Sequence, residues 1–505
     1  MKSVAAYFDS LWQRNPLAVI LLLSLLVRLA AVFFSKGYSM HDDHFLVIEI
    51  SQSWVEGKDV FNWFSKSIEE NSSGRNFLYP GLHYLLFTGL ETIKITDPQQ
   101  KMLIVRLLHA VYSLIVVWLG YKLVNNISGT EAARNAALIL GLLWIIPSMS
   151  VRNLVEVVVV PLLMTAVYIL YNKNKPSDSW LWIACAGFLC GLAFPIRYQT
   201  ILFSAGIGLV MLMERKFKSL ILFSGGVLLA IALISGYLEY QLWGYAFQKV
   251  VYYFTYNMNN AYEYTSQSWY FYLLLLLMVF IPPLSFFIVV GFARSYKKYT
   301  LIFVPTFLFL LAHSFFPNKQ ERFMFTVLPF FVISGTATIQ EFFQSCGVKN
   351  YLKKVWELSW VFFWIVNIPL LCMFIFSYSK KARTEAMYYL HDKGPVQHIV
   401  LDYSFDKRYV QLPRFYMKHQ WPEIYEYSGE KPVDEVYKEL TTAHRMPQYI
   451  LFLNEGNIEQ RVAAWKKNFA SLHRVCIAEP SLLDKIFYTL NKINVNEAIY
   501  IYKTY

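Results

Sequence analysis

The chain has 505 residues, of which 56% are hydrophobic and only 16% are charged, and its formal net charge is +12. This composition argues against a soluble protein and favours a polytopic membrane protein. The positive charge is no argument for nucleic-acid binding, because many Lys and Arg residues stand in short loops between apolar runs, as expected on the cytoplasmic side of a membrane.

Apolar runs long enough to cross a hydrocarbon core of roughly 30 Å recur from the N-terminus to about residue 377. They predict an α-helical polytopic protein with about eleven transmembrane helices. The runs occupy residues 16–34, 102–121, 132–149, 154–171, 180–196, 199–213, 218–236, 270–292, 300–316, 323–340 and 355–377.

The loops alternate in their content of Lys and Arg, which predicts the orientation of the chain in the membrane. The outer side receives the first loop, 35–100, an aromatic-rich loop at 237–269, the turn 317–323 and everything after residue 378. We expect residues 77–95 to form an interfacial or re-entrant helix, because counting them as a span would invert every later loop.

The composition changes from about residue 385, where charges return and apolar runs shorten to strand length. This pattern predicts a small α/β domain on the outer side. The expected strands are 398–403, 448–454, 473–479 and 498–505, with helices near 433–442, 456–469 and 480–492. We therefore predict a transmembrane domain over residues 1–380 and an extracytoplasmic domain over residues 381–505.

Two acids and two imidazoles follow the first span directly, as His41, Asp42, Asp43 and His44. A carboxylate next to an apolar wall can act as a general base when a substrate hydroxyl comes within hydrogen-bond reach. The acids could equally cap a helix N-terminus, where they satisfy free N–H groups. A metal site is the weaker interpretation, because adjacent residues rarely converge on one ion.

A charged turn, Pro317 to Phe323, stands between two long apolar runs and contains Lys319, Glu321 and Arg322. Charges at the rim of a bilayer are costly unless they contact headgroups, a partner or a substrate. A lipid phosphate could pair with the two cations, Lys319 and Arg322.

Further polar residues are predicted at the same outer level: Arg75, then Arg152 with Glu156, then Arg197. A single Arg at a span end usually extends to the headgroups. Together with the charged turn, these residues predict an outward cavity that holds an anionic headgroup beside carboxylates. Arg28 lies within the first span, where we expect contact with headgroups or with a backbone carbonyl rather than with substrate.

These motifs resemble those of glycosyltransferase family 22, the GT-C mannosyltransferases of the GPI-anchor and asparagine-linked glycan pathways. The signature His-Lys-Glu-x-Arg-Phe corresponds to Asn318 through Phe323, and Pro-Asp-Glu in the first loop corresponds to His41 through Asp43. The resemblance covers about residues 16–345. The C-terminal Ile499-Tyr500-Ile501-Tyr502-Lys503 is weakly similar to the end of the GPI third-mannose enzymes.

The resemblance implies an inverting transfer of a hexose, mannose in that family, from a polyprenyl-phosphate (dolichyl or undecaprenyl) donor to a glycolipid or glycan acceptor. Asp42 would then be the base and Asp43 would orient the acceptor or share the role. Donor phosphate would be bound by Lys319, Arg322, Arg75 and Arg197, and other substrate contacts would come from His41, His44, Arg152, Glu156 and Glu321. Asn318 and Gln320 stand where the family has a His and a Glu. Neither residue can carry a charge, so no role in proton transfer or charge stabilisation is assigned to these two positions.

No cofactor or metal ion is expected, since phosphate is a good leaving group. The alternatives are a transporter or flippase of lipid-linked saccharides and a GT-C enzyme for arabinose or aminoarabinose. A transporter should show paired halves, and we find no internal repeat. The outer domain shows no disulfide set, which favours a bacterial inner membrane over the endoplasmic reticulum.

Overall fold

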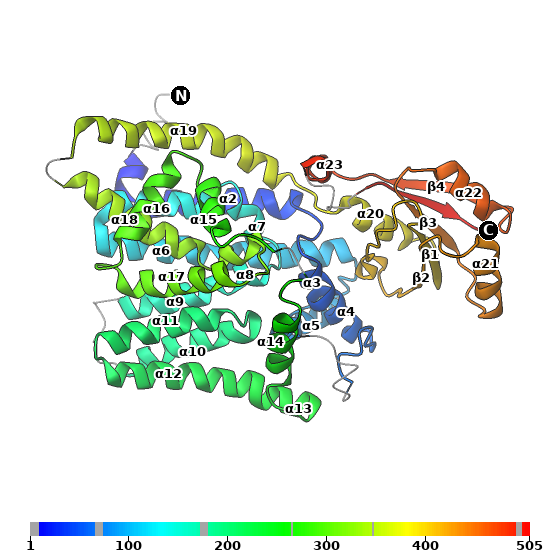
Figure 1. Cartoon of the computed structure of the whole chain (residues 1–505), viewed down its shortest axis with the longest axis horizontal. Helices are drawn as coiled ribbons and strands as arrows, with labels where there is room; N and C mark the ends of the chain where they lie inside the picture. The colour runs from blue at the N-terminus through cyan, green and yellow to red at the C-terminus, as the bar shows by residue number, and fades with distance from the viewer. Residues whose placement is uncertain (1–9, 66–73, 172–179, 264–265, 346–347, 491–496) are drawn as a thin grey trace. The chain divides into compact units, whose positions relative to one another are not determined.

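The computed structural model describes residues 10–65, 74–171, 180–263, 266–345, 348–490 and 497–505 (Figure 1). The chain forms two compact units. The helical unit comprises Met1–Val32, Phe61–Leu82 and Val105–Ile375. The mixed unit comprises Phe33–Val60, His83–Ile104 and Phe376–Tyr505. The boundary predicted at residue 380 stays a prediction.

The helical unit is built from helices that vary widely in length. Their bounds are α2 (Pro16–Phe34), α6 (Pro98–Leu142), α7 (Ile146–Ser150), α8 (Val155–Val158), α9 (Val160–Tyr171), α10 (Trp180–Ile196), α11 (Thr200–Met213), α12 (Phe217–Ile231), η2 (Ala232–Leu238), α13 (Glu239–Trp243), α14 (Gln248–Asn259), α15 (Phe271–Val279), α16 (Leu284–Arg294), α17 (Thr300–Phe315), η3 (Glu321–Thr326), α18 (Leu328–Gln344) and α19 (Asn350–Ile375).

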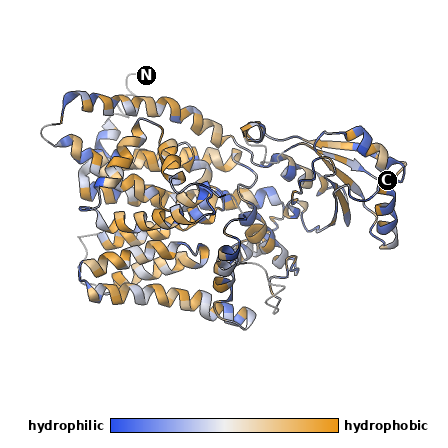
Figure 2. Cartoon of the chain, viewed as in Figure 1, coloured by the Kyte–Doolittle hydropathy of each residue, from blue (hydrophilic) through white to orange (hydrophobic). Residues whose placement is uncertain are grey.

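Within the described residues, four helices are long and apolar enough to cross a membrane: Pro16–Phe34, Pro98–Leu142, Phe217–Trp243 and Asn350–Ile375. Of these, Pro98–Leu142 consists of two helices that meet at a kink at Gly129, whose φ of 82° is not helical. Figure 2 shows hydrophobic residues along most helices of this unit. The prediction of about eleven spans is not confirmed. One reason is visible at 270–292, where Pro282 and Pro283 separate α15 from α16, since proline lacks the backbone N–H that a helix needs.

Small residues allow α10 and α12 to pack closely, side by side in Figure 1. A Cβ atom on Gly187 would lie 2.0 Å from the carbonyl oxygen of Phe223. A Cβ atom on Gly226 would lie 2.2 Å from the carbonyl oxygen of Ala184. Glycine is therefore required on both helices, which is a common way for apolar helices to associate in a membrane.

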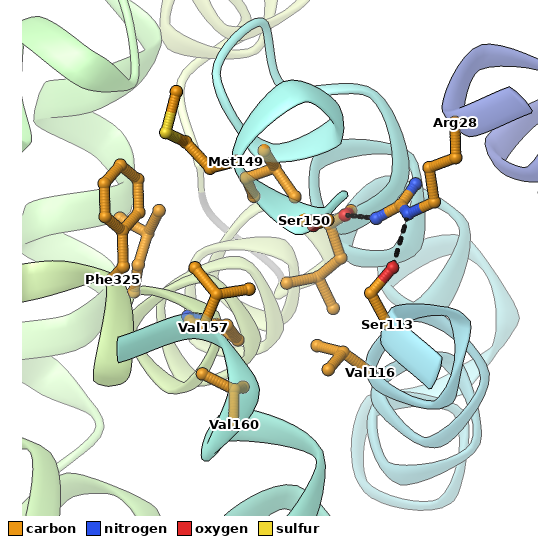
Figure 3. A pocket seen from close by; sticks show the side chains of 12 residues that line it. Arg28, Ser113, Val116, Met149, Ser150, Val157, Val160 and Phe325 are labelled. Carbon is orange, nitrogen blue, oxygen red and sulfur yellow. Dashed lines mark hydrogen bonds between the residues drawn. The ribbon is translucent and has the colours of Figure 1, made fainter. Parts of the chain in front are cut away.

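Arg28 on α2 connects this helix to α6 (Figure 3). Its Nε donates to Ser113 Oγ at 2.8 Å, and its Nη1 donates to the carbonyl oxygen of Gly141 at 2.9 Å. The side chain is fully buried and lines a small cavity with apolar neighbours. Of the two roles expected for Arg28, the structure shows the carbonyl contact.

The first outer loop supplies α3 (His41–Asp43), η1 (His44–Glu49), α4 (Ile50–Val55) and α5 (Leu78–Thr92), and α5 confirms a helix in the stretch predicted at 77–95. Within the mixed unit, η1 packs against η4 (Arg414–Met417). The carboxylate of Glu49 is fully buried and accepts hydrogen bonds from Arg414 Nε and Phe415 N, both at 3.3 Å.

The C-terminal part forms a five-stranded sheet in the order β2-β1-β3-β5-β4. Strands β1, β2 and β3 are parallel, whereas β5 runs antiparallel to β3 and β4. The bounds are β1 (His398–Asp402), β2 (Glu423–Tyr427), β3 (Tyr449–Leu453), β4 (His473–Ala478) and β5 (Ile499–Lys503), with α20 (Lys381–Leu390), α21 (Val433–Thr442), α22 (Ile458–Lys466) and α23 (Leu482–Leu490).

The four strands expected from the sequence are all present, and β2 is the strand that the sequence did not indicate. It is an edge strand, and four of its five residues are exposed or only partly buried. Its sequence, EIYEY, lacks the apolar run that identifies a buried strand. The end of the helix predicted at 480–492 lies outside the described residues.

Candidate functional site

The helical unit buries a cluster of charged residues where three helix ends meet. Glu156 belongs to α8, Arg197 follows α10 and Arg322 lies in η3. Arg197 Nη2 is 3.2 Å from Glu156 Oε1, and Arg322 Nε is 3.5 Å from the same oxygen. The exposed fractions are 0% for Glu156, 6% for Arg197 and 7% for Arg322. We call these three residues the Glu156 cluster.

Local contacts hold the members of the cluster in place. The turn that carries Arg197 follows Pro195 and leads into α11. Arg322 Nε also donates to Gln320 Oε1 at 2.7 Å. Thr326 Oγ1 donates to the backbone oxygen of Glu156 at 3.3 Å, so η3 and α8 are directly connected.

The cluster carries more positive than negative charge. Two guanidinium groups face one carboxylate, and Arg75 lies near enough for its charge to interact with Glu156 as well. The ring of Phe323 lies 4.7 Å from Arg197 Cζ and 5.8 Å from Arg322 Cζ, measured to its centroid. An anion with several acceptor oxygens would balance the excess charge, because arginine presents a planar fork of donors to such groups.

An apolar cavity of about 180 Å³ lies beside the Glu156 cluster, and Phe323 lines it. Aromatic and aliphatic side chains make up most of its wall. The remaining lining residues are Gln199, Leu202, Tyr253, Phe254, Asn257, Met258, Ala312, His313, Phe316 and Asn318. A hydrocarbon chain is the ligand that such a wall favours, since burial of apolar surface is the main gain in an apolar pocket.

The other residues of the charged turn differ in exposure. Lys319 is 4% exposed and its Nζ donates to the carbonyl oxygen of Phe316 at 2.7 Å. Burial lowers the pKa of Lys319 from its ordinary value. Glu321 is exposed at the start of η3. Arg152 is 6% exposed and precedes Glu156 in the turn between α7 and α8.

The predicted acid pair belongs to the mixed unit. The Asp42 side chain is 47% exposed, and its Oδ1 lies 3.6 Å from Nδ1 of His41. Asp43 is only 3% exposed. Met40 occupies the N-cap position of α3, so neither acid is the N-cap residue considered as an alternative. Of the two carboxylates, Asp42 is the one that a ligand can reach.

His44 is fully buried between two tyrosine rings. Its ring stacks on Tyr38 with centroids 4.5 Å apart and on Tyr416 with centroids 5.7 Å apart. Burial lowers the pKa of His44 to about 3, so the imidazole is neutral at physiological pH. This environment supports a packing role, and its predicted substrate contact stays a prediction.

The structure thus brings together Glu156, Arg197 and Arg322, with Arg75 close by. The approach of Asp42 and Asp43 to this cluster remains a prediction. Sequence reasoning gave no role to Phe323 or Gln320, although both lie within the charged turn that it singled out. It also missed Glu49, an acid in the apolar run FLVIEI, which was the available signal.

No group of three or more His, Cys, Asp or Glu side chains within the described ranges is arranged to hold a metal ion. The Glu156 cluster consists of two cations and one carboxylate, which is a set of groups suited to an anion rather than to a metal ion.

The model of the Alg9-like mannosyltransferase family matches residues 19–403 of the chain. The fold is similar to that of ArnT from Cupriavidus metallidurans bound to undecaprenyl phosphate, with a TM-score of 0.62 and 12% identity over 96% of this chain and 97% of that one. It is also similar to the oligosaccharyltransferase AglB from Archaeoglobus fulgidus in complex with an inhibitory peptide and a dolichol-phosphate. That comparison gives a TM-score of 0.52 and 11% identity over 90% of this chain and 71% of the other.

A search of curated proteins gave no match. The family match spans about three quarters of the chain, and the two solved structures are GT-C glycosyltransferases with the same general fold. The resemblance inferred from the motifs is therefore confirmed, and the protein is a membrane protein of this fold. The chain belongs to the Alg9-like mannosyltransferase family of glycosyltransferases.

Proposed function

We propose that this protein transfers a hexose, mannose in the first instance, from a polyprenyl-phosphate donor to a glycolipid or glycan acceptor. The Glu156 cluster carries the proposal, because it places excess positive charge beside an apolar cavity in a chain of this family. A polyprenyl phosphate combines the two chemistries that such a site favours, an anionic head and a hydrocarbon chain.

The donor phosphate would bind between Arg197 and Arg322, with Arg75 and Lys319 adding positive charge. Glu156 would orient the two guanidinium groups, since a buried carboxylate between two arginines restricts their rotamers. The first isoprene units would enter the cavity lined by Phe323. ArnT was solved with undecaprenyl phosphate and AglB with a dolichol-phosphate, which supports this class of donor for the fold.

In the proposed reaction, an acceptor hydroxyl attacks the anomeric carbon of the donor sugar. A new C–O bond forms, the bond between the anomeric carbon and the phosphate oxygen breaks, and the configuration inverts. The hydroxyl proton passes to a carboxylate of Asp42, and the electron pair leaves with the lipid phosphate. The arginines stabilise the negative charge that develops on this phosphate.

We assign the acceptor side to the outer-loop residues. Asp42 is the exposed member of the acid pair, which suits a general base. The buried Asp43 would orient the acceptor or share the role of base. His41, Arg152 and Glu321 complete the proposed substrate contacts. We retain His44 as a neighbour that positions the acid-bearing turn through its stacking contacts.

Transfer of radiolabel from defined polyprenyl-phosphate hexoses to an extracted acceptor by the purified protein tests the function. Wild type should use the mannose donor and should not use a nucleotide sugar. Asp42→Asn should lower single-turnover transfer by about 10²–10⁴-fold, the usual contribution of a positioned base, whereas Asp43→Asn should have a milder effect. Transfer at the wild-type rate by both variants would remove the acid pair from the mechanism.

We place the reaction on the extracytoplasmic side of the membrane, with a bacterial inner membrane favoured over the endoplasmic reticulum. The alternation of Lys and Arg between loops supports this orientation. Alkaline phosphatase fused after residue 380 should be active. An inactive fusion there, together with an active fusion after residue 217, would reverse the orientation and contradict the proposed side.

A further inference from the structure

The sheet of the mixed unit has a cavity of about 360 Å³ that the proposed transfer does not use. Ligand pockets in proteins commonly have volumes of about 300–1,000 Å³. The residues that line this cavity are Asp402, Ser404, Phe405, Tyr427, Val433, Asn457, Gln460, Arg461, Ala464 and Trp465.

The cavity lies where open α/β sheets bind their ligands. Strand β1 pairs with β2 on one side and with β3 on the other, so the chain changes direction across the sheet at β1. Ligands bind outside the carboxyl ends of the strands at such a switch point. Asp402 and Tyr427 are the last residues of β1 and β2, and α22, which follows β3, carries Gln460 and Arg461.

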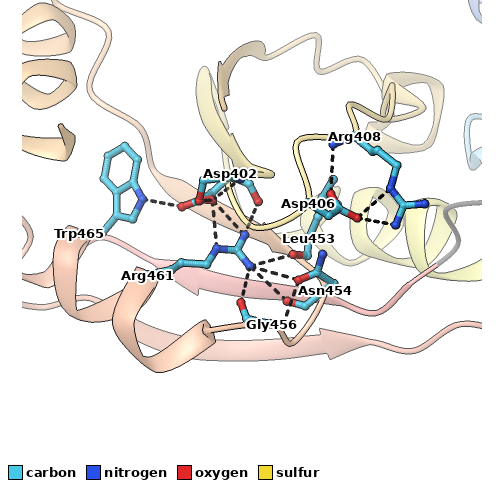
Figure 4. Close-up of polar contacts among 9 residues, drawn as sticks. Asp402, Asp406, Arg408, Leu453, Asn454, Gly456, Arg461 and Trp465 are labelled. Carbon is cyan, nitrogen blue, oxygen red and sulfur yellow. Dashed lines mark hydrogen bonds and ion pairs between the residues drawn. The ribbon is translucent and has the colours of Figure 1, made fainter. Parts of the chain in front are cut away.

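The charges that line the cavity cancel each other (Figure 4). Arg461 Nη2 lies 2.9 Å from Asp402 Oδ1, and Trp465 Nε1 donates to Asp402 Oδ2 at 2.8 Å. Arg461 also donates to the carbonyl oxygens of Leu453 and Gly456 at 2.9 and 3.2 Å. A phosphate or another anion therefore finds no surplus cation in this wall, and a neutral ligand fits the site best.

The rim supplies an aromatic face and two amides. Phe405 is 49% exposed although it lines the cavity, and Asn457 and Gln460 are exposed as well. An amide side chain both donates and accepts hydrogen bonds, which suits a hydroxyl group. The face of an aromatic ring carries partial negative charge and packs against C–H groups, such as those on one side of a pyranose ring.

The turn after β3 holds this arrangement in place. Asn454 and Asn457 have φ angles of 54° and 49°, a left-handed conformation that asparagine tolerates better than most residues. Gly456 lies against the ring of Phe405, where a Cβ atom would be 2.3 Å from the nearest ring carbon. The ring of Phe405 therefore packs directly against the backbone of Gly456, and a methyl group added to Gly456 would displace the ring.

We propose that this cavity in the mixed unit binds a neutral saccharide. The choice of a saccharide among neutral polar ligands rests on the proposed function, whereas the position of the site rests on the sheet geometry alone. A sugar ring would pack on Phe405 while its hydroxyl groups bond to Asn457 and Gln460. This site would bind part of the glycan away from the reacting hydroxyl.

Saturation-transfer NMR on the full-length protein in nanodiscs tests the site, with mannobiose and mannotriose as probes and glycerol as the control polyol. Wild type should transfer saturation to the saccharides and not to glycerol. Gln460→Ala should weaken binding about fivefold, as expected for the loss of one hydrogen bond. Phe405→Ala and Gly456→Ala should weaken it about tenfold, because they remove or displace the aromatic face.

Glu459→Ala is the matched control, since Glu459 is an exposed neighbour on the same helix that does not line the cavity. It should bind as wild type does. Equal saccharide signals in wild type, Phe405→Ala and Gly456→Ala, or no signal in wild type, would overturn the site. Donor lipid is absent from this assay, so failed binding with active transfer rejects this site alone. Saccharide binding without transfer rejects the proposed function alone.

Discussion

Two of the carboxylates that are buried against arginine, Asp402 and Glu156, differ in how completely the charges around them are balanced. In the mixed unit, one arginine faces one carboxylate, and Arg461 bonds to carbonyl oxygens as well as to Asp402. In the helical unit, two arginines share one oxygen of Glu156, so the Glu156 cluster keeps one positive charge in excess. The charges at Asp402 balance without a ligand, whereas the excess positive charge at Glu156 can be balanced by an anionic ligand.

This comparison predicts that charge removal lowers transfer only in the helical unit, although it lowers stability in both units because each carboxylate is buried. The double variant Arg197→Ala with Arg322→Ala should lower transfer by at least about 10²–10³-fold, the usual loss for one preorganised donor at a developing anion. Single-turnover transfer measures the effect, and a thermal melt excludes misfolding. Folded protein with unchanged transfer would show that the Glu156 cluster only anchors the helices.

Arg461→Ala should act mainly on folding. Removal of one partner from a buried ion pair typically costs about 3–5 kcal/mol, because the remaining charge has no compensation. We expect a lower melting temperature and increased proteolysis of the C-terminal sheet. An unchanged melting temperature would mean that other groups compensate the charge of Asp402. It would contradict the proposed difference between the sites at Asp402 and Glu156.

Arg322→Lys sharpens the account of the helical unit. It keeps the charge but loses the planar fork, so transfer should fall by about tenfold even though the net charge is unchanged. The KM for the donor should rise in the same assay. If lysine restores full activity, only the charge of Arg322 is needed and the bidentate geometry proposed for the phosphate is wrong.

His44→Phe should change the pH dependence of stability by a smaller amount. The buried native imidazole has a pKa of about 3, whereas the unfolded side chain titrates near 6.5. The unfolded state therefore binds an extra proton below about pH 6.5. As the pH falls, the free energy of unfolding decreases by up to about 1.4 kcal/mol per pH unit. Phenylalanine preserves the stack between Tyr38 and Tyr416 without this titration.

Thermal melts of both proteins from about pH 6.5 down to pH 4.5 measure the difference that this linkage predicts. Glu49, Lys380 and His41 also interact electrostatically with His44. Because these three residues are present in both proteins, their own contributions to the pH dependence of stability largely cancel when the two melts are compared. The curve of His44→Phe should be flatter. Parallel curves would contradict a neutral, buried His44.

Much of the fold followed from the sequence, because long apolar runs and strand-length runs reflect burial directly. The sheet strands β1, β3, β4 and β5 were predicted in this way. The edge strand β2 was missed because partial burial hides a strand. The break at Pro282 and Pro283 was missed because the run 270–292 was judged by its length and hydropathy, although two prolines are themselves a signal of a helix break.

The candidate site was predicted in its residue types but not in its pairing. The predicted spans and the alternation of Lys and Arg between loops suggested that Arg197, Arg322 and Glu156 lie at one level of the membrane. The oxygen of Glu156 that both arginines share, and the contact of each guanidinium group with the ring of Phe323, depend on how three helix ends far apart in the sequence pack together. No local sequence pattern predicts such packing.

Binding of undecaprenyl phosphate without a sugar tests the central claim most directly, because it isolates the proposed role of the Glu156 cluster from the chemistry. Native mass spectrometry of the purified protein should show lipid bound to wild type and to Arg294→Ala, a control in which an exposed arginine outside the cluster is lost. Arg322→Ala should weaken binding by about tenfold or more, as expected for a lost charge-assisted contact. Equal binding by all three proteins would contradict a phosphate site at Glu156, Arg197 and Arg322.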